Sequence, residues 1–154
     1  MTAHLTADPI QIEFPTLGDR LLVVYDGYCG LCNRSIRWFL KRDLFDRLRF
    51  TPSDSTAVTP ILARHGIDAL SPSSLIVIEN PGNPSERILT RSTGVLAMLS
   101  QLPTPWPTCA TLLGVVPRPL RDLGYRIVAA LRYRLVGRYA SCPIPTPEER
   151  RHFL

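Results

Sequence analysis

The chain has 154 residues, of which 45% are apolar and 20% charged, a balance typical of a soluble globular protein large enough for its own core. Its four cysteines are too few for a small secreted scaffold held by disulfides, and its apolar stretches are too short to span a membrane. The formal net charge of +5 comes wholly from residues 117–154, where eight arginines stand against three acids; residues 1–116 hold ten bases and ten acids. A solvated helix face is the plain interpretation of this excess. Contact with an acidic partner is the functional alternative, and no nucleic acid is expected.

The first twenty residues are predicted to be a polar lead-in. They have neither the basic start nor the apolar run of a signal peptide, and they contain Asp8, Glu13 and Asp19. We therefore expect a cytoplasmic protein without a transmembrane segment, in a compartment that keeps its thiols reduced.

The next eighty residues alternate between apolar runs and turn signals. Leu21 to Tyr25 is a continuous apolar run, typical of a strand buried on both faces. Strands are predicted at 21–25, 49–51, 75–78 and 87–90, and helices at 31–47, 55–64 (closed by Gly66) and from Ser92, as the cap, to about 102. The order strand, helix, strand, helix, strand, strand, helix predicts an α/β sandwich of the thioredoxin-like type.

The last third of the chain is predicted to be an extension. Five prolines interrupt 103–119, so 104–119 is predicted to be a linker with at most a short helix. A basic helix follows over 121–138, with Leu123, Ile127, Leu131 and Leu135 on one stripe. We expect a lead-in at 1–20, a thioredoxin-like domain at 21–102, and an extension at 103–154 that packs on that domain.

Cys29 and Cys32 stand between the first predicted strand and the first predicted helix. A thiol at a helix N-terminus faces unpaired backbone N–H groups and the positive end of the helix dipole, which favour the thiolate. A thiolate attacks disulfides, and a second thiol one turn later can resolve the mixed disulfide. Cys29 is therefore the candidate nucleophile, expected to be partly exposed, and Cys32 the candidate resolving thiol. Metal ligation and a purely structural pair are the alternatives.

The other candidate metal ligands are scattered. Cys109 and Cys142 are single cysteines far apart, and His4, His65 and His152 have no ligand spacing, so no metal and no cofactor are predicted. Cys109 and Cys142 are interpreted as small apolar fillers. The functional alternative is that Cys142 folds back as a third redox thiol.

Asp26 directly follows the first predicted strand. A phosphatase of the haloacid-dehalogenase type would need a second aspartate two residues later, where Tyr28 stands. Asp26 is interpreted as a loop residue that accepts backbone N–H bonds, and proton relay is the alternative if it lies near Cys32. Trp38 is interpreted as a packing residue, with a docking surface beside the thiols as its functional alternative.

Residues 24–33, Val-Tyr-Asp-Gly-Tyr-Cys-Gly-Leu-Cys-Asn, resemble the D-G-x-C-x-L-C-N signature of the DCC family (DUF393) of thiol–disulfide oxidoreductases. The resemblance continues through Thr90-Arg91-Ser92 into Cys142-Pro143 and spans about 21–154. It implies a thioredoxin-like fold and protein-disulfide reductase activity, with Asp26, Cys29 and Cys32 as signature residues. The chain departs from ordinary thioredoxins in lacking a proline directly before the third strand, since Pro72 comes slightly early.

Two functional hypotheses follow. The first is a thiol–disulfide oxidoreductase whose CxxC dithiol reduces a protein or small-molecule disulfide and is reset by an external thiol reductant. The alternative is a thioredoxin-like binding module with a non-catalytic or metal-binding CxxC. Such a module would use the arginine-rich C-terminal helix to hold an acidic or membrane partner.

Overall fold

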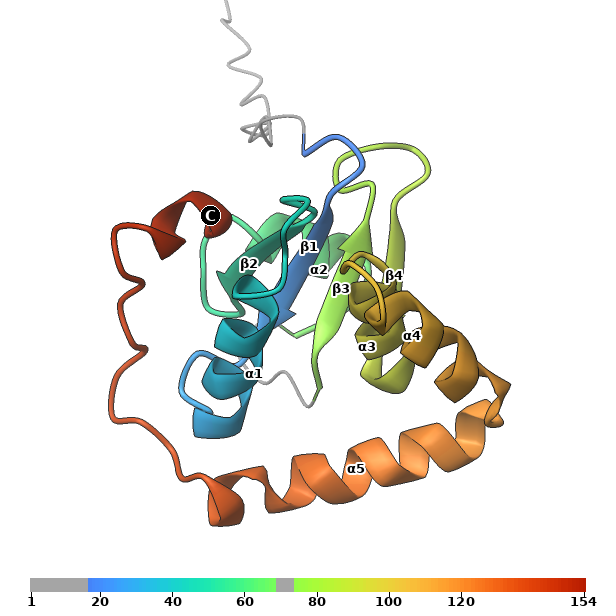
Figure 1. The fold of residues 1–154 in the computed structure, drawn as a ribbon. Helices are drawn as coiled ribbons and strands as arrows, with labels where there is room; N and C mark the ends of the chain where they lie inside the picture. The colour runs from blue at the N-terminus through green and yellow to red at the C-terminus, as the bar shows by residue number, and fades with distance from the viewer. Residues whose placement is uncertain (1–16, 69–73) are drawn as a thin grey trace, which may run out of the picture.

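A computed structural model describes residues 17–68 and 74–154 and gives a mixed α/β fold around a four-stranded sheet (Figure 1). The strand order is β2-β1-β3-β4; β1 runs parallel to β2 and antiparallel to β3, and β3 runs antiparallel to β4. The strands are β1 Leu21–Tyr25, β2 Leu48–Pro52, β3 Ile76–Glu79 and β4 Arg87–Thr90. All four predicted strands are present; the predicted lead-in up to residue 16 and Pro72 lie outside the described residues.

Helices cover both faces of the sheet. They are α1 Gly30–Leu40, α2 Thr59–Arg64, α3 Arg91–Ser100, α4 Trp106–Val115 and α5 Arg118–Leu135, with a short 3-10 turn, η1, at Glu149–His152. Alternate residues of β1 divide between two cores: Val23 packs with side chains of α1 and α3, and Val24 packs with side chains of α2. All five β1 residues are buried, which explains the unbroken apolar run in the sequence.

Several predicted boundaries differ from the structure: the second helix begins at Thr59 rather than residue 55, and the basic helix spans Arg118–Leu135 rather than 121–138. The first helix ends at Leu40 rather than Arg47, because the Asp43 carboxylate accepts the backbone N–H groups of Arg47 and Leu48 and ends the helical pattern. Ser92 is not a cap; Thr90 holds that position, and the Ser92 hydroxyl donates instead to Asp122 of α5. The stretch predicted to be mostly linker contains the ten-residue α4, which begins beside its prolines, where a missing N–H costs nothing.

Helix α5 lies across the end of the sheet with its apolar side outward (Figure 1). Its contacts with the rest of the fold are polar: Asp122 accepts from Ser92, the Tyr125 hydroxyl accepts the backbone N–H of Leu75, and Arg132 faces Asp26. The predicted stripe is therefore present but points to solvent, because Leu123, Ile127, Leu131 and Leu135 are all exposed.

The C-terminus returns to the open side of β2. The Phe153 ring packs against Tyr25 and Phe50, with ring centroids 6.5 and 5.9 Å away, and the Leu154 N–H donates to the Phe50 carbonyl. Within residues 17–68 and 74–154, no helix combines the length and apolarity needed to cross a membrane.

Candidate functional site

Cys29 is the N-cap residue of α1. It follows β1 after the short loop 26–28, and its extended backbone (φ −80°, ψ 118°) aims the sulfur at the first turn of the helix. The Sγ accepts the backbone N–H of Cys32 at 3.3 Å. The position at a helix start is the predicted one, and it places a backbone donor and the positive end of the helix dipole at this sulfur.

The Cys29 side chain is fully buried, which corrects the expectation that it is partly exposed. Residues 136–139, which we call the strap, follow α5 and cross the loop that carries it. The Gly30 N–H donates to the Gly137 carbonyl at 3.1 Å, and the Tyr139 N–H donates to the Tyr28 carbonyl at 2.7 Å. Arg138 also forms a β-bridge with Cys29 itself. A reagent can therefore reach the Cys29 sulfur only if the structure around this loop opens, and the strap is bound directly to the loop.

Cys32 lies one helical turn later and remains partly exposed. Burial raises the pKa of its thiol to about 12, helped by a hydrogen bond with the Cys29 thiol, by the charge of Cys29 and by that of Asp26, while Arg132 opposes the shift. Cys32 therefore holds its proton at neutral pH.

Asp26 holds the loop and also faces the thiols. Its Oδ1 accepts the Tyr28 N–H at 2.9 Å, which is the predicted loop role. Its Oδ2 accepts the Tyr133 hydroxyl and lies 3.6 Å from the Arg132 guanidinium. The charge of Asp26 contributes to the raised pKa of Cys32. Whether it relays protons stays a prediction.

Asn33 fixes the loop from inside α1. Its buried side-chain amide donates to the Gly27 carbonyl at 2.7 Å and to the Cys29 carbonyl at 3.0 Å. These bonds satisfy two carbonyl groups that the turn into the helix leaves without strand partners.

A cavity of about 300 Å³ adjoins Cys32 between α1, α3 and α5. Its walls are mostly apolar, and the polar groups along it are Cys32, Ser35, Tyr125 and Arg132. Arg132 is nearly buried, with 12% of its side chain exposed, and its Nε has no hydrogen-bond partner. An unpaired buried donor beside a thiol is an unusual feature, because such groups are costly to bury.

The remaining cysteines have different surroundings. Cys142 folds back on the loop before Cys29: a Cβ added at Gly27 would lie 2.5 Å from the Cys142 sulfur. Burial, together with Asp54 and Asp26, raises the pKa of the Cys142 thiol. Cys109 lies on α4 away from this loop. The fold-back that the third-thiol alternative requires is therefore present, while a redox role for Cys142 stays a prediction.

Trp38 is a packing residue, as interpreted. Its ring meets that of Trp106 edge-on at 4.6 Å between centroids, and the Arg42 guanidinium lies 4.0 Å above it.

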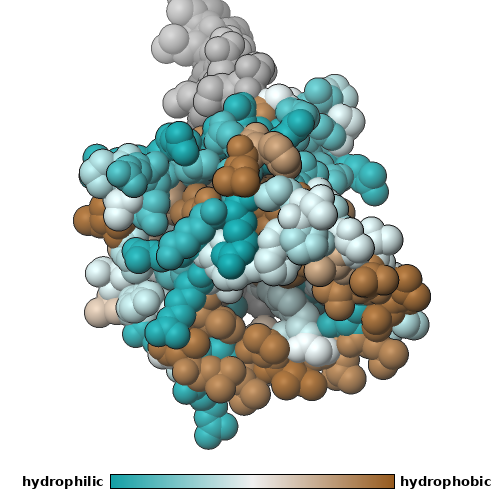
Figure 2. Space-filling view, viewed as in Figure 1, coloured by the Kyte–Doolittle hydropathy of each residue, from teal (hydrophilic) through white to brown (hydrophobic). Residues whose placement is uncertain are grey.

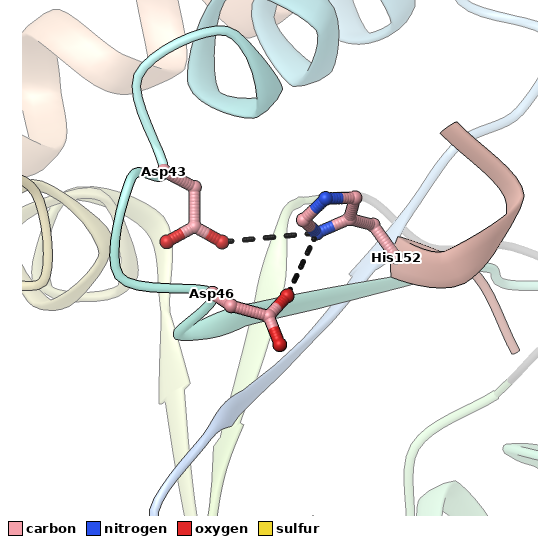
Figure 3. Close-up of side chains that lie close together, drawn as sticks. All are labelled: Asp43, Asp46 and His152. Atoms are coloured by element: carbon pink, nitrogen blue, oxygen red, sulfur yellow. Dashed lines mark ion pairs between the residues drawn. The ribbon is translucent and has the colours of Figure 1, made fainter. Parts of the chain in front are cut away.

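A second cluster of titratable groups lies at the docked C-terminus (Figure 3). The Nδ1 of the buried His152 points between two carboxylates, 3.9 Å from Asp43 and 3.5 Å from Asp46. Metal binding is disfavoured here, because Asp46 already pairs with Arg20 and Arg49. The His152 Nε2 accepts a hydrogen bond from the Arg151 guanidinium. The cluster fastens the C-terminus to the turn before β2.

In the described part of the chain, this cluster is the only set of three His, Cys, Asp or Glu side chains close enough to hold an ion. Cys29 and Cys32 are therefore joined by no third ligand there, and a structural zinc site needs four.

Sequence reasoning missed Arg132, Tyr125 and the strap. The first two lie on the polar face of α5, which an ordinary amphipathic interpretation assigns to solvent. Two signals pointed to this region: the excess of arginine after residue 117, and the family resemblance, which includes Arg132-Tyr133-Arg134 and Gly137-Arg138. Nothing in the sequence pattern indicated that residues 136–139 would return to Cys29.

Comparison with known proteins agrees with this geometry. The profile of the DCC1-like thiol-disulfide oxidoreductase family matches residues 23–138. The uncharacterised protein YuxK of Bacillus subtilis is 29% identical over 133 residues, covering 86% of this chain and 93% of YuxK. A chloroplastic DCC family protein of Arabidopsis thaliana is 31% identical over 125 residues, covering 81% and 70% of the two chains. No solved structure matches significantly.

Proposed function

Because the chain belongs to the DCC1-like thiol-disulfide oxidoreductase family, we propose that it exchanges disulfides through the Cys29–Cys32 dithiol, on a thioredoxin-like arrangement of strands and helices. The observation that carries the proposal is the position of the two thiols. Cys29 caps α1 and accepts the Cys32 N–H, and the Cys32 thiol lies within hydrogen-bonding reach one turn later.

The surroundings favour Cys29 as the attacking sulfur. It receives the backbone N–H at the helix start, whereas the pKa of Cys32 is raised to about 12. Cys29 attacks one sulfur of the substrate disulfide, and the other leaves as a thiol after taking up a proton. Cys32 then loses its proton and attacks Cys29, which releases the second thiol and leaves a Cys29–Cys32 disulfide. An external thiol reduces that bond.

Asp26 is our candidate for the group that receives the Cys32 proton in the second step. Its charge contributes to the raised pKa of Cys32, and it contacts Tyr133 and Arg132 of α5. A carboxylate in this place supports general base catalysis of the resolving attack.

The test is a single turnover with 4,4′-dithiodipyridine, in a protein whose Cys109 and Cys142 are changed to serine. We expect the reduced protein to release two thiopyridones and form the internal disulfide. Cys32→Ser should release one and retain the other as a stable mixed disulfide. A parent protein that also stops after one thiopyridone on Cys29 would contradict resolution by Cys32.

The binding-module alternative draws on the burial of Cys29 and the high pKa of Cys32, both features of an unreactive pair. It predicts that neither cysteine reacts with the reagent in the folded protein, so the same experiment separates the two functions.

A further inference from the structure

The cavity beside Cys32 has the properties of a small-molecule site. Its volume of about 300 Å³ is at the lower end of the range typical of ligand pockets. Apolar side chains of α1 and α3, among them Ile36, Phe39 and Met98, form its walls. An apolar group of modest size fits such a space.

The backbone at the mouth of the cavity is closed to a polypeptide. Leu75, just before β3, lines the cavity, and its N–H already donates to the Tyr125 hydroxyl at 2.8 Å. Because β3 lies between β1 and β4, the backbone just before it is where a peptide could pair, and it would need that donor. Helix α5 therefore occupies the place where an extended chain would pair.

The charged group that lines the cavity is the Arg132 guanidinium, which also contacts Asp26 and the Tyr133 hydroxyl. Its Nε is buried and has no hydrogen-bond partner. A carboxylate of a bound molecule would pair with this guanidinium through a charge-assisted hydrogen bond.

We propose that this cavity binds a small apolar disulfide with an acidic group, with its acid on Arg132 and its sulfurs beside Cys32, the thiol of the pair that lines the cavity. Attack by the buried Cys29 then requires the loop around it to open. The proposal rests on the proposed exchange reaction and names its substrate class. The two protein thiols supply two electrons, the substrate disulfide leaves as two thiols, and the Cys29–Cys32 disulfide remains.

The test compares three disulfides, each rate being divided by the rate with free dithiothreitol. The probes are 5,5′-dithiobis(2-nitrobenzoate), which is aromatic and acidic, 4,4′-dithiodipyridine, which is aromatic and neutral, and cystamine, which is aliphatic and cationic. We expect a preference in that order. Arg132 also opposes the raised pKa of Cys32, so Arg132→Gln changes the rate with every probe, and the readout is a ratio. The rate with the acidic probe divided by that with the neutral probe should fall about tenfold or more, as for a lost bond to a charged group.

Two alanines of α5 give a matched pair of variants. Ala129 lines the cavity, and Ala130 is exposed on the outer side. Ala129→Phe should fill the space and remove the preference for the aromatic probes, whereas Ala130→Phe should leave it. Equal normalised rates with all probes, or an equal effect of both variants, would overturn the substrate class while the exchange reaction stands. Failure of every probe to oxidise the pair would instead overturn the exchange reaction itself.

A separate observation concerns the outer face of α4 and α5. Both helices expose large apolar side chains, and Figure 2 shows hydrophobic surface running along this end of the molecule. The exposed residues, which we call the outer patch, are Leu112, Leu113, Val115, Val116, Leu120, Leu123, Ile127, Leu131 and Leu135. A continuous apolar patch on a protein surface marks a place of contact.

The charges around the outer patch are of one sign. Arg118, Arg126, Arg134 and Arg138 are exposed along α5 and the strap, and the single acid between residues 104 and 140 is Asp122, which is mostly buried against Ser92. A helix with leucines on one side and arginines beside them is typical of a segment that lies in the interface of an anionic membrane.

We infer that the outer patch rests on the surface of an anionic lipid bilayer, with α5 parallel to it. The test is co-sedimentation of the full chain with vesicles of phosphatidylcholine containing 30% phosphatidylglycerol, and with vesicles of phosphatidylcholine alone. Binding should occur to the anionic vesicles and weaken with salt.

Two variants separate the causes. Leu123→Glu/Ile127→Glu should abolish binding by placing charge in the apolar boundary, and Arg126→Gln/Arg134→Gln should weaken it without changing the fold seen by circular dichroism. A chain that binds neither vesicle, or that forms dimers which Ile127→Glu dissociates, would overturn the inference, since the patch would then serve no membrane.

Discussion

Cys29 and Cys32 lie one helical turn apart, yet the fold treats their sulfurs differently. The Cys29 sulfur accepts a backbone N–H and lies at the positive end of the helix dipole, but it is buried, and the strap is hydrogen-bonded to its loop. Cys32 faces a cavity but is kept protonated by burial and by its neighbours. The sulfur at the helix start is therefore Cys29, whereas the sulfur that a substrate can reach is Cys32. We therefore expect the reaction of Cys29 to depend on movement of the strap.

The raised pKa of Cys32 can be measured directly. In reduced protein lacking Cys109 and Cys142, the rate at which iodoacetamide modifies Cys32 should still increase above pH 10, because its thiolate forms only near pH 12. In urea the rate should level off near the ordinary cysteine value of about 8.5. By the same shift, the contribution of Cys32 to stability is complete below about pH 8.5 and is lost as pH rises toward 12. A folded-state plateau below pH 9 would contradict the account.

Asp26→Asn tests the carboxylate beside the thiols. The Asp26 charge helps to raise the pKa of Cys32 and partly neutralises Arg132. Its removal should therefore lower the pKa of Cys32 and shift the alkylation profile to lower pH. If Asp26 also takes the Cys32 proton, the second thiopyridone should be released more slowly even though Cys32 ionises more easily. An unchanged second step would restrict Asp26 to its loop role.

At the scale of elements, the strap docks on a glycine. A Cβ added at Gly30 would lie 3.0 to 3.1 Å from atoms of Val136 and Gly137, so the bare backbone of Gly30 is what lets the strap approach Cys29. Gly30→Ala should loosen the strap and raise the alkylation rate of Cys29 several-fold. Gly114→Ala, where an added Cβ meets nothing within 4 Å, is the control. Equal rates in both variants would show that the strap does not limit access.

The sequence pattern predicted the elements better than their orientation. The buried run at β1 and the return of β4 were placed correctly, because burial on both faces and turn chemistry leave local signals. Helix α5 was also expected, but periodicity identifies only a stripe and not the side that faces the core. Partners distant in sequence, such as Leu75 for Tyr125, decided that side.

The candidate site likewise combines residues that are close in the sequence with residues that only the fold brings together. Cys29, Cys32 and Asp26 lie within seven residues, so their proximity follows from one turn and one helix start. Arg132 and the strap reach the site from a hundred residues away, through tertiary packing that has no local signature. Burial of Cys29 could not be predicted for this reason.

At the scale of the whole molecule, the C-terminus is bound to β2 at the edge of the sheet and to the turn before it. The Asp46 carboxylate contacts Arg49, Arg20 and His152, and its hydrogen bonds with Arg49 hold its pKa well below the usual range. A lowered carboxyl pKa stabilises the fold above about pH 4 and loses that effect as pH falls through the folded-state value.

Asp46→Asn should therefore reduce the free energy of unfolding at pH 7 by about 0.5–1 kcal/mol, a modest effect because the side chain is half exposed to screening solvent. The deficit should shrink between pH 4 and pH 2, as measured by urea unfolding. Glu148→Gln, at an exposed carboxylate, should match the parent protein at every pH. If the loss in free energy of unfolding stays constant between pH 4 and pH 2, the ion pairs of Asp46 are not its source.

The most direct measurement is the identity of the bond that forms when the protein is oxidised. The chain is equilibrated with glutathione buffers over a range of potentials, trapped with acid and alkylating reagent, and mapped by peptide mass. The account predicts one cooperative two-electron transition that joins Cys29 to Cys32. A bond from Cys29 to Cys142, or a Cys29 that stays reduced throughout, would contradict it.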